Sequence, residues 1–339
     1  MYDAVDRGLA ALLIGRSQAI ERVRSLIRKV GPSTLPVLIQ GPTGSGKELV
    51  AQALHLASGR TGSFVAFNVC SIAETIFEDT LFGHVRGAFT GAVGDTDGYL
   101  KESDRGTLFL DEISGLPLAA QVKLLRAIES KEFRPIGARK DHRSDFRLIS
   151  ATNDRLDHVV REGRFRSDLL YRLRGIVIEL PPLSARLEDV PLLARFFARG
   201  QLNQHGAETQ LSEGAIDALL QHDWPGNVRE LRAVVQCAIA LSECASVSRA
   251  ECLRAASLSG DTRQLVKRRA DLVAQRLLEV LEQTGWDVDA TAILLGVHRA
   301  TVYRRLGRLR NASVRSSPAG AAGTLVAGEA AMTSMAGKE

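Results

Sequence analysis

A glycine-rich segment that ends in a lysine, Gly41-Pro42-Thr43-Gly44-Ser45-Gly46-Lys47, follows a short apolar run and precedes an amphipathic stretch. Between a strand and a helix, glycines let backbone N–H groups face inward, the helix start adds positive potential, and the lysine reaches terminal phosphates. The pattern therefore predicts a phosphate-binding loop, with a glycine-rich turn that binds nothing as the alternative. Glu48 stands where the usual pattern has a serine or threonine that contacts Mg²⁺.

An acidic pair, Asp111-Glu112, ends a later apolar run at 106–110. In an open α/β sheet the carboxyl ends of the strands face one crevice, so we expect this pair to face the phosphate-binding loop. Asp111 is then placed to hold Mg²⁺, directly or through water, and Glu112 to polarise an attacking water. Without the loop upstream, an exposed strand end would explain the pair equally well.

Polar and cationic groups follow at what we expect to be the same edge. Asn153 ends a third apolar run, and arginines occur in 164–166, at Arg172, and at Arg229 within 224–231. A guanidinium group suits phosphoryl oxygens, and a neighbouring subunit can supply one. Isolated arginines are more often surface ion-pair residues, so these positions need further support.

The elements that must position these groups read as a doubly wound parallel sheet. Short apolar runs without polar alternation are typical of strands buried on both faces of such a sheet, and helical patterns such as 48–58 and 118–130 separate them. The expected strands are 36–40, 64–69, 107–110, 146–152 and 176–180.

The remaining chain divides by composition. After Pro181-Pro182 the pattern is helical, which predicts a small all-helical part. The tail lacks apolar periodicity and is rich in Ala, Gly, Ser and Thr, so we expect disorder there. The expected divisions are a short N-terminal segment 1–13, an α/β part 14–180, a helical lid 181–247, a linker 248–266, a further helical module 267–311 and the tail 312–339.

Charge is distributed unevenly along the 339 residues, which contain 44 Lys+Arg and 39 Asp+Glu for a net charge of +5. Residues 261–315 hold 11 basic and 6 acidic side chains, whereas residues 1–260 hold 32 and 31. The basic surplus therefore belongs to the module near the C-terminus, where a polyanionic partner is expected.

Several classes of protein are excluded. No apolar run approaches the ~20 residues of a membrane helix, and acids at Asp3 and Asp6 stand where a signal peptide is basic. We therefore expect a cytoplasmic protein without membrane contact. The cysteines form no C-x-x-C pair and are interpreted as small core residues; they are Cys70, Cys237, Cys244 and Cys252.

One further segment, Leu81-Phe82-Gly83-His84-Val85-Arg86-Gly87-Ala88-Phe89-Thr90-Gly91-Ala92, resembles the ELFGHxxGAFTGA element of the AAA+ bacterial enhancer-binding proteins. These are ATPases that activate sigma-54 RNA polymerase. The resemblance runs from about Ile14 to Arg310 and implies an AAA+ P-loop NTPase with a helical lid. It departs at Thr80, which replaces a glutamate, and at Ser184-Ala185-Arg186, which replaces Arg-Glu-Arg.

The resemblance implies a role for each candidate residue, with ATP and Mg²⁺ as cofactors. Residues 41–48 and the second sensor Arg229 bind ATP, Lys47 in the loop included, and Asp111 holds Mg²⁺. Glu112 activates water, Asn68 restrains that glutamate, Asn153 is the first sensor, and Arg166 and Arg172 are arginine fingers that act across subunits. The sigma-54 contact is Gly87, Ala88, Phe89, Thr90, Gly91 and Ala92, of which Phe89 and Thr90 are the contacting side chains.

The basic module resembles the helix-turn-helix of the Fis type that ends enhancer-binding proteins. The pattern predicts a helix over 290–295, a turn at Gly296 and a second helix over 299–309. We expect the second helix to enter a major groove of DNA. A solvated basic helix face is the alternative. The candidate DNA contacts are His298, Arg299, Thr301 and Tyr303 near bases or their phosphates, and Arg304, Arg305 and Arg308 at phosphates.

These expectations combine into a DNA-tethered ring ATPase that converts closed sigma-54 promoter complexes to open ones. The match begins near residue 14, so an N-terminal regulatory domain is not expected and a separate regulatory protein is a candidate partner. The ring is expected to be a homohexamer or a hetero-oligomer with a related activator. The alternative is a repressor or architectural DNA-binding protein whose ATPase is vestigial; a helicase loader or chaperone-type ATPase leaves the hexapeptide unexplained.

Overall fold

The computed structural model describes residues 2–203, 205, 208–259, 281, 284, 287, 288 and 291. The chain divides into two units, Met1–Ser259 and Gly260–Glu339. The predicted DNA contacts from His298 to Arg308 and the tail 312–339 lie outside the described residues. Within the described part, no helix combines the length and the apolar character that crossing a bilayer requires.

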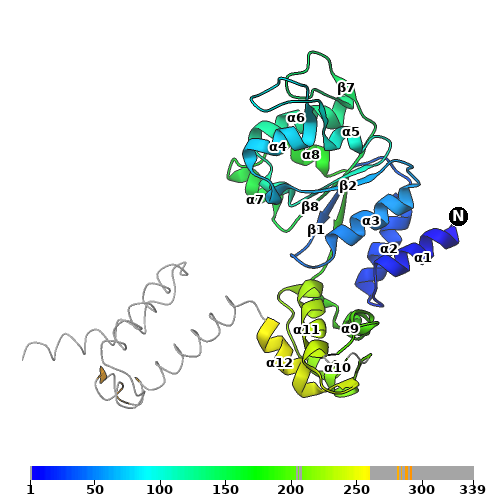
Figure 1. Cartoon of the computed structure of the whole chain (residues 1–339), viewed down its shortest axis with the longest axis vertical. Helices are drawn as coiled ribbons and strands as arrows, with labels where there is room; N and C mark the ends of the chain where they lie inside the picture. Colours follow the sequence, from blue (N-terminus) through cyan, green and yellow to red (C-terminus); the bar gives the residue numbers. More distant parts are fainter. Residues whose placement is uncertain are drawn as a thin grey trace, which may run out of the picture. The chain divides into compact units, whose positions relative to one another are not determined.

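The first unit contains a five-stranded sheet in which every strand pair is parallel (Figure 1). Neighbouring strands are not consecutive in sequence, so each connection crosses over through a helical segment. This confirms the predicted doubly wound α/β class. The strand order is β2 (Phe64–Asn68), β5 (Thr107–Asp111), β8 (Arg147–Thr152), β1 (Val37–Gln40) and β9 (Ile176–Glu179).

Burial differs between the centre and the edges of the sheet. Strand β8 is buried throughout and β1 and β5 nearly so, as predicted for strands covered on both faces. The edge strands β2 and β9 are only partly buried, so the expectation of two covered faces was wrong for them. An edge strand has one neighbour instead of two, and the helices here do not cover it completely.

Alternate residues of the strands belong to two separate cores. Val37 and Ile39 pack with the helices α1 (Tyr2–Leu12), α2 (Gln18–Val30) and α3 (Lys47–Ser58). Leu38 between them packs into the core on the other face, since successive strand side chains point to opposite faces. The helices on that face are α4 (Glu74–Phe82), α5 (Tyr99–Glu102), α6 (Leu118–Ser130), α7 (Leu156–Arg161) and α8 (Ser167–Leu173).

A helical lid follows the sheet, with a core around the buried Trp224. Its helices are α9 (Val190–Ala198), α10 (Glu213–Leu220), α11 (Asn227–Leu241) and α12 (Arg249–Ser259). Two short strands, β10 (Gln210–Leu211) and β11 (Ser246–Val247), pair in parallel beside them, which the sequence pattern did not predict.

Helix α12 corrects one predicted boundary, because residues 249–259 were expected to be part of a linker. Cys252 and Ala255 are buried in the lid core, and α12 packs against α10 and α11. Ser257, one of the small residues that resembled a linker, is exposed on this helix, so Cys252 and Ala255 provide the packing instead. The lid core therefore extends to the end of the first unit.

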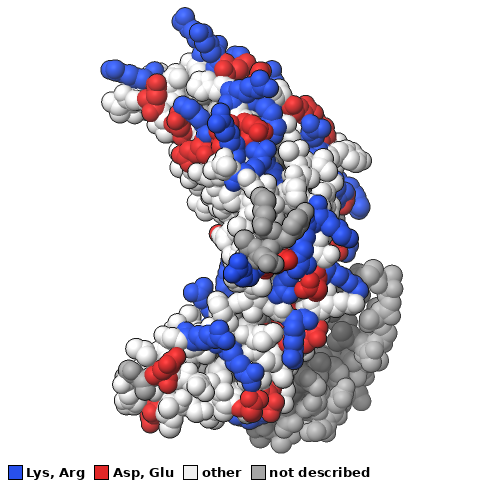
Figure 2. Space-filling model, turned by 90° about the vertical axis from the view of Figure 1, so that its right-hand side faces the viewer, with Lys and Arg blue, Asp and Glu red and all other residues white. Residues whose placement is uncertain are grey.

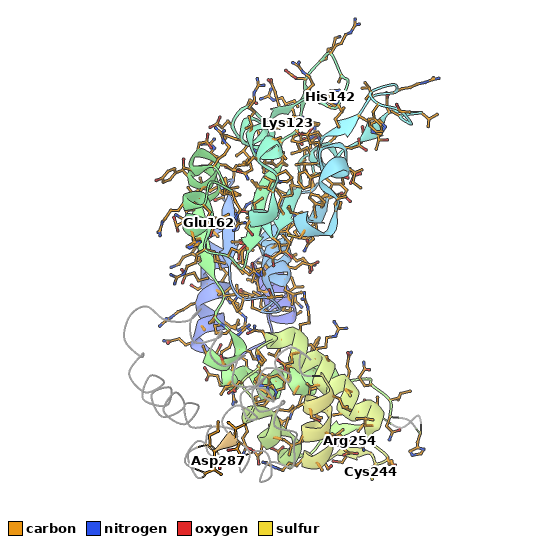
Figure 3. All side chains as sticks on the ribbon, turned by 90° about the vertical axis from the view of Figure 1, so that its left-hand side faces the viewer. Lys123, His142, Glu162, Cys244, Arg254 and Asp287 are labelled. Carbon is orange, nitrogen blue, oxygen red and sulfur yellow. The ribbon has the colours of Figure 1, made fainter. Side chains whose placement is uncertain are left out.

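The cysteines are less uniform than predicted. Cys252 is buried and Cys237 half-buried, but Cys70 and Cys244 are exposed. Cys70 follows the end of β2, and Cys244 lies in the loop after α11 (Figure 3). The interpretation as core residues was therefore wrong for two of the four, because loop positions after an element are decided by tertiary contacts.

Asp189 ties the lid to the start of α2 and is fully buried. Its Oδ1 accepts the N–H groups of Arg16 at 2.6 Å and Ser17 at 2.8 Å, and its Oδ2 accepts the Ser17 hydroxyl at 2.7 Å. Ser17 in turn caps α2 through the N–H of Ile20. The carboxylate thus fixes both the chain entry and the helix cap.

Asp189→Ala is expected to lower the free energy of unfolding by ~2–4 kcal/mol, because three donors, two of them buried, lose a charged acceptor. Chemical denaturation of the variant beside wild type measures this. Asp217→Ala, at an exposed position of α10, is the control and should change stability by ~0.5 kcal/mol or less. Equal stability of the two variants would contradict the assigned role of Asp189.

Candidate functional site

The predicted phosphate-binding loop connects β1 to α3, as its sequence required. Gly44 and Gly46 adopt left-handed φ values of 76° and 105°, which side chains rarely tolerate. The Gly41 N–H donates to the Thr152 carbonyl at 3.2 Å and so joins the loop to β8. Among the bonds of the described residues, none uses the N–H groups of Gly44, Gly46 or Lys47. These groups and the start of α3 form a site with positive potential.

Lys47 and Glu112 meet beside this loop. The Lys47 side chain is 6% exposed, and its Nζ donates to the Gly41 carbonyl at 3.2 Å. The same Nζ lies 3.5 Å from Oε1 of Glu112. A buried ammonium with a single carboxylate partner in this geometry has donor capacity left for an anion.

Glu112 follows β5 with a left-handed φ of 53°. Its Oε2 accepts the backbone N–H of Asn153 at 3.4 Å, and the Asn153 amide donates to the Thr43 hydroxyl at 3.1 Å. The predicted first sensor, the predicted catalytic carboxylate and the loop therefore belong to one connected group. Backbone strain at a non-glycine residue is common where a side chain must be held for chemistry.

Asn68 differs from expectation, because its amide contacts Asp111 and not Glu112. The Asn68 Nδ2 donates to Asp111 Oδ2 at 3.3 Å, and its Oδ1 caps the following turn through the N–H of Cys70. The reason is register: Asn68 and Asp111 are paired positions of β2 and β5, so their side chains point to the same side.

Cys70 lies next to the two carboxylates, which the sequence did not indicate. Although the residue is exposed, partial desolvation raises the pKa of its thiol, and the charges of Glu112 and Asp111 raise it further. The thiol is therefore in its neutral form near pH 7.

The Mg²⁺ donor set is small. Asp111 supplies one carboxylate, whose Oδ1 also accepts the N–H of Glu112 at 3.0 Å. Glu48 is exposed and accepts a hydrogen bond from Gln52. Within the described residues there is no cluster of three or more possible metal ligands. A lone carboxylate fits Mg²⁺, which is commonly held by one or two carboxylates together with phosphate oxygens and water.

The two predicted arginine fingers lie on or beside α8, away from the loop of their own chain. Arg166 precedes α8, is exposed, and pairs with Asp168 at 2.6 Å. Gln121 fixes its backbone by accepting the N–H at 2.8 Å. Arg172, in the last turn of α8, is also exposed. Within the described chain, neither guanidinium bonds to the phosphate-binding loop or to the acidic pair.

Arg229 lies at the start of α11, directly beside the loop. Its backbone N–H donates to the Gly44 carbonyl at 3.3 Å, and its side chain is exposed. A methyl group added at Gly44 would lie 3.1 Å from the Arg229 Cβ. The lid therefore places this predicted sensor next to the site.

The GAFTGA segment forms the tip of a hairpin between β3 (Gly83–His84) and β4 (Thr96–Asp97). The Gly87 N–H donates to the Ala92 carbonyl at 2.9 Å, which closes the tip, and Gly87 and Gly91 both have positive φ. Phe89 is 46% exposed, and its ring meets the His84 ring at 4.9 Å. Thr90 is exposed beside it.

A second hairpin, β6 (Glu132–Phe133) with β7 (His142–Arg143), supports the base of the first. The Ile136 N–H donates to the Gly83 carbonyl at 2.8 Å, and the Val85 N–H donates to the Ile136 carbonyl at 3.1 Å. His142 and Lys123 lie at this end of the unit, opposite the lid residues Cys244 and Arg254 (Figure 3). The base of the GAFTGA hairpin is therefore fixed while its tip is exposed.

Charge on the described surface matches the near-neutral sequence. Lysine and arginine side chains alternate with aspartate and glutamate over the face in Figure 2. Most of these pairs are exposed, as in the ion pairs Lys101–Asp97 and Arg134–Asp141. Such exposed pairs contribute little to the stability of the fold.

The sheet order, the phosphate-binding loop, the acidic pair after β5 and the lid arginine together define the AAA+ class of P-loop ATPases. Family models agree: "Sigma-54 interaction domain" matches residues 13–179 and "AAA+ ATPase lid domain" matches 184–285. "Bacterial regulatory protein, Fis family" matches 269–309, which confirms the predicted helix-turn-helix. The lid match past residue 247 agrees with the corrected boundary.

Curated relatives are transcriptional regulators. VasH of Vibrio cholerae is 47% identical over 240 residues, which are 69% of this chain and 45% of VasH. ZraR of Salmonella typhimurium is 40% identical over 305 residues, which are 87% of this chain and 68% of ZraR. The chain therefore belongs to the AAA+ sigma-54 enhancer-binding protein family, and it spans less than half the length of VasH.

Solved structures of a relative have the same fold. NtrX from Brucella abortus in complex with ATP is 32% identical with a TM-score of 0.65, over 88% of this chain and 69% of NtrX. Another NtrX crystal structure gives 30% identity and a TM-score of 0.66, over 90% of this chain and 70% of NtrX.

Proposed function

We propose that this chain is a sigma-54-dependent activator that binds upstream DNA and uses ATP hydrolysis in a ring to convert closed promoter complexes to open ones. One observation carries the proposal: the same unit holds a connected Lys47–Glu112–Asn153 group at its phosphate-binding loop and an exposed GAFTGA tip. The first can turn over ATP and the second can contact a protein partner. The match to the sigma-54 interaction domain supports the choice of that partner.

At the nucleotide site, each group has a distinct task. The free N–H groups of the loop and Lys47 hold the β- and γ-phosphates. Glu112 accepts a hydrogen bond from the attacking water and so aims it at the γ-phosphorus. Asn153 donates its backbone N–H to Glu112 and its side-chain amide to Thr43. It therefore fixes the position of the carboxylate relative to the loop. Mg²⁺, held by Asp111, neutralises charge on the phosphate oxygens when bound.

A short path along the chain links this site to the GAFTGA tip. Asn68 bonds to Asp111 and caps the turn Val69–Ser71, which leads into α4. Helix α4 continues directly into the hairpin that carries Phe89. A change in the contacts of Asp111 during hydrolysis therefore acts on the base of α4, which displaces the tip.

DNA and neighbouring subunits complete the proposed assembly. The helix-turn-helix residues from His298 to Arg308 bind double-stranded DNA upstream of promoters and tether the ring there. The ring is a homohexamer or a hetero-oligomer with a related activator. ATP lies between subunits, with Arg166 and Arg172 of the neighbour reaching the γ-phosphate.

Mixing variants tests whether the arginines act across subunits. Arg172→Ala alone is expected to lower the ATPase rate by ~10³-fold or more, as losing an arginine finger does. Mixed with an excess of inactive Glu112→Gln subunits, it should regain activity, because some interfaces then combine an intact Glu112 with a neighbour's intact Arg172. Phosphate release as a function of mixing ratio measures this. No recovery at any ratio would show that Arg172 acts within its own chain or only supports the fold.

The activity itself is tested by open-complex formation in vitro. The full chain, ATP, promoter DNA and sigma-54 holoenzyme should give permanganate-reactive, melted DNA at the start site. Omission of ATP should abolish the signal. A protein that hydrolyses ATP and binds DNA but melts no promoter would refute the proposal.

A further inference from the structure

Three successive carbonyl groups of the phosphate-binding loop are each bonded to the lid. These bonds run from Asn227 Nδ2 to the Thr43 oxygen at 3.0 Å, from the Val228 N–H to the Gly44 oxygen at 3.0 Å, and from Arg186 Nη2 to the Ser45 oxygen at 2.8 Å. We call these lid donors the carbonyl clamp. The Arg229 N–H also donates to the Gly44 oxygen, at 3.3 Å, so two of the four donors are side chains, and substitution can remove those two one at a time.

The clamp determines which way the loop peptides face. In a planar trans peptide the C=O and N–H groups point in opposite directions. Holding the Thr43 and Ser45 carbonyls toward the lid therefore turns the N–H groups of Gly44 and Gly46 away from it, and neither N–H has a partner among the bonds of the described residues. Those are the groups that a phosphate needs.

Arg186 is built into this interface and is only 4% exposed. Burial lowers the pKa of its guanidinium, and the nearby charge of Asp189 opposes that shift. Its Nε has no hydrogen-bond partner within the described chain, so Arg186 bears a desolvation cost that Asp189 offsets only in part while it holds the Ser45 carbonyl. The sequence departs from the family pattern around this residue, at Ser184-Ala185-Arg186.

Asn227 uses both ends of its amide and is 2% exposed. Its Oδ1 accepts the Leu183 N–H at 2.7 Å, and its Nδ2 holds the Thr43 carbonyl. Its φ of 56° is a left-handed value that asparagine tolerates better than most residues. Space is also tight, because a methyl group at Gly44 would lie 2.4 Å from the Gly226 carbonyl.

We propose that Arg186 and Asn227 are positioning residues for the nucleotide: they hold the loop carbonyls so that phosphate affinity depends on a docked lid. This inference rests on the proposed binding of ATP at the loop, and it adds Arg186 and Asn227 to the residues on which that binding depends. Neither residue touches the phosphates, so each acts through the orientation of the loop peptides. If the lid moves away and these hydrogen bonds break, the affinity of the loop for the product ADP would fall.

The test uses two variants of the full chain that each remove one clamp donor. Asn227→Asp keeps the acceptor for Leu183 but places an oxygen against the Thr43 carbonyl, and Arg186→Gln removes the guanidinium. Each should weaken binding of a fluorescent ATP analogue by about tenfold or more and raise KM for ATP similarly, because a loop carbonyl loses the donor that orients its peptide. Arg186→Lys retains a donor and should recover part of the loss.

Controls separate positioning from simple destabilisation. Arg195→Gln removes a lid arginine that pairs with Glu213, away from the loop, and should leave KM unchanged. Loss of folded protein lowers the observed rate by the same factor at every ATP concentration and leaves KM unchanged. An unchanged KM in the clamp variants would therefore overturn the proposal. So would an equal rise in KM for Arg195→Gln. Failure of wild type to bind the analogue would instead refute the proposed function.

Discussion

Replacement of Glu112 by glutamine is expected to lower the rate of ATP hydrolysis by ~10²–10⁴-fold while ATP still binds. Glutamine has the shape of glutamate but cannot accept a proton or polarise water to the same degree. Its single amide oxygen can keep one of the two contacts, with Lys47 or with the Asn153 N–H, because these donate to different oxygens of the Glu112 carboxylate. Phosphate release at saturating ATP, beside the dissociation constant of a fluorescent ATP analogue, measures both effects.

Glu129→Gln is the matched control, because Glu129 is an exposed glutamate of α6 outside the site. It should hydrolyse ATP within about twofold of the wild-type rate, as surface substitutions usually do little. Equal rates for Glu112→Gln and wild type would favour the alternative of a DNA-binding repressor or architectural protein with a vestigial ATPase.

Removal of the Phe89 side chain, or of the Thr90 hydroxyl, is expected to uncouple hydrolysis from promoter opening. Phe89 is half-exposed at a closed turn, and the base of that turn is fixed by hydrogen bonds to Ile136. An exposed aromatic anchor of this kind commonly contributes 2 kcal/mol or more to a contact, so Phe89→Ala should reduce open complexes by about 30-fold. Thr90→Ala should also reduce the amount of open complex.

The ATPase rate of both variants should stay within about twofold of wild type, since neither residue lies at the nucleotide site. Val93→Ala, in the same loop and 85% exposed, serves as the control and should still open promoters. Wild-type levels of open complex with Thr90→Ala and Phe89→Ala would refute the assignment of the tip as the sigma-54 contact.

Much of the fold was predictable because the responsible signals are local. The five strands are short apolar runs bounded by turns, and each was found close to its predicted place. The lid ended later than expected, because α12 is held by Cys252 and Ala255 in a core contributed by other helices. A small-residue helix has no strong apolar stripe, so its sequence alone resembles a connector.

In the candidate site, too, local patterns were predictable and contacts between distant segments were not. The loop 41–47, Asp111, Glu112 and Asn153 were predicted from their positions at strand ends, and the parallel sheet brings strand ends to one edge. The partner of Asn68 was not predictable in this way, since the pairing of β2 with β5 decides it. Arg186 and Asn227 were also missed as loop contacts, because the bonded atoms are far apart in sequence.

The sequence by itself determined the candidate chemistry of this protein: a glycine loop with Lys47, an acidic pair after an apolar run, and an intact GAFTGA segment are contiguous patterns that can be recognised without the fold. Only the tertiary structure decided which groups hold that chemistry in place. Carbonyl partners for the loop come from the lid, and the base of the GAFTGA hairpin is held by a second hairpin. Hydrogen bonds between distant segments depend on how the chain packs, and residue spacing does not encode them.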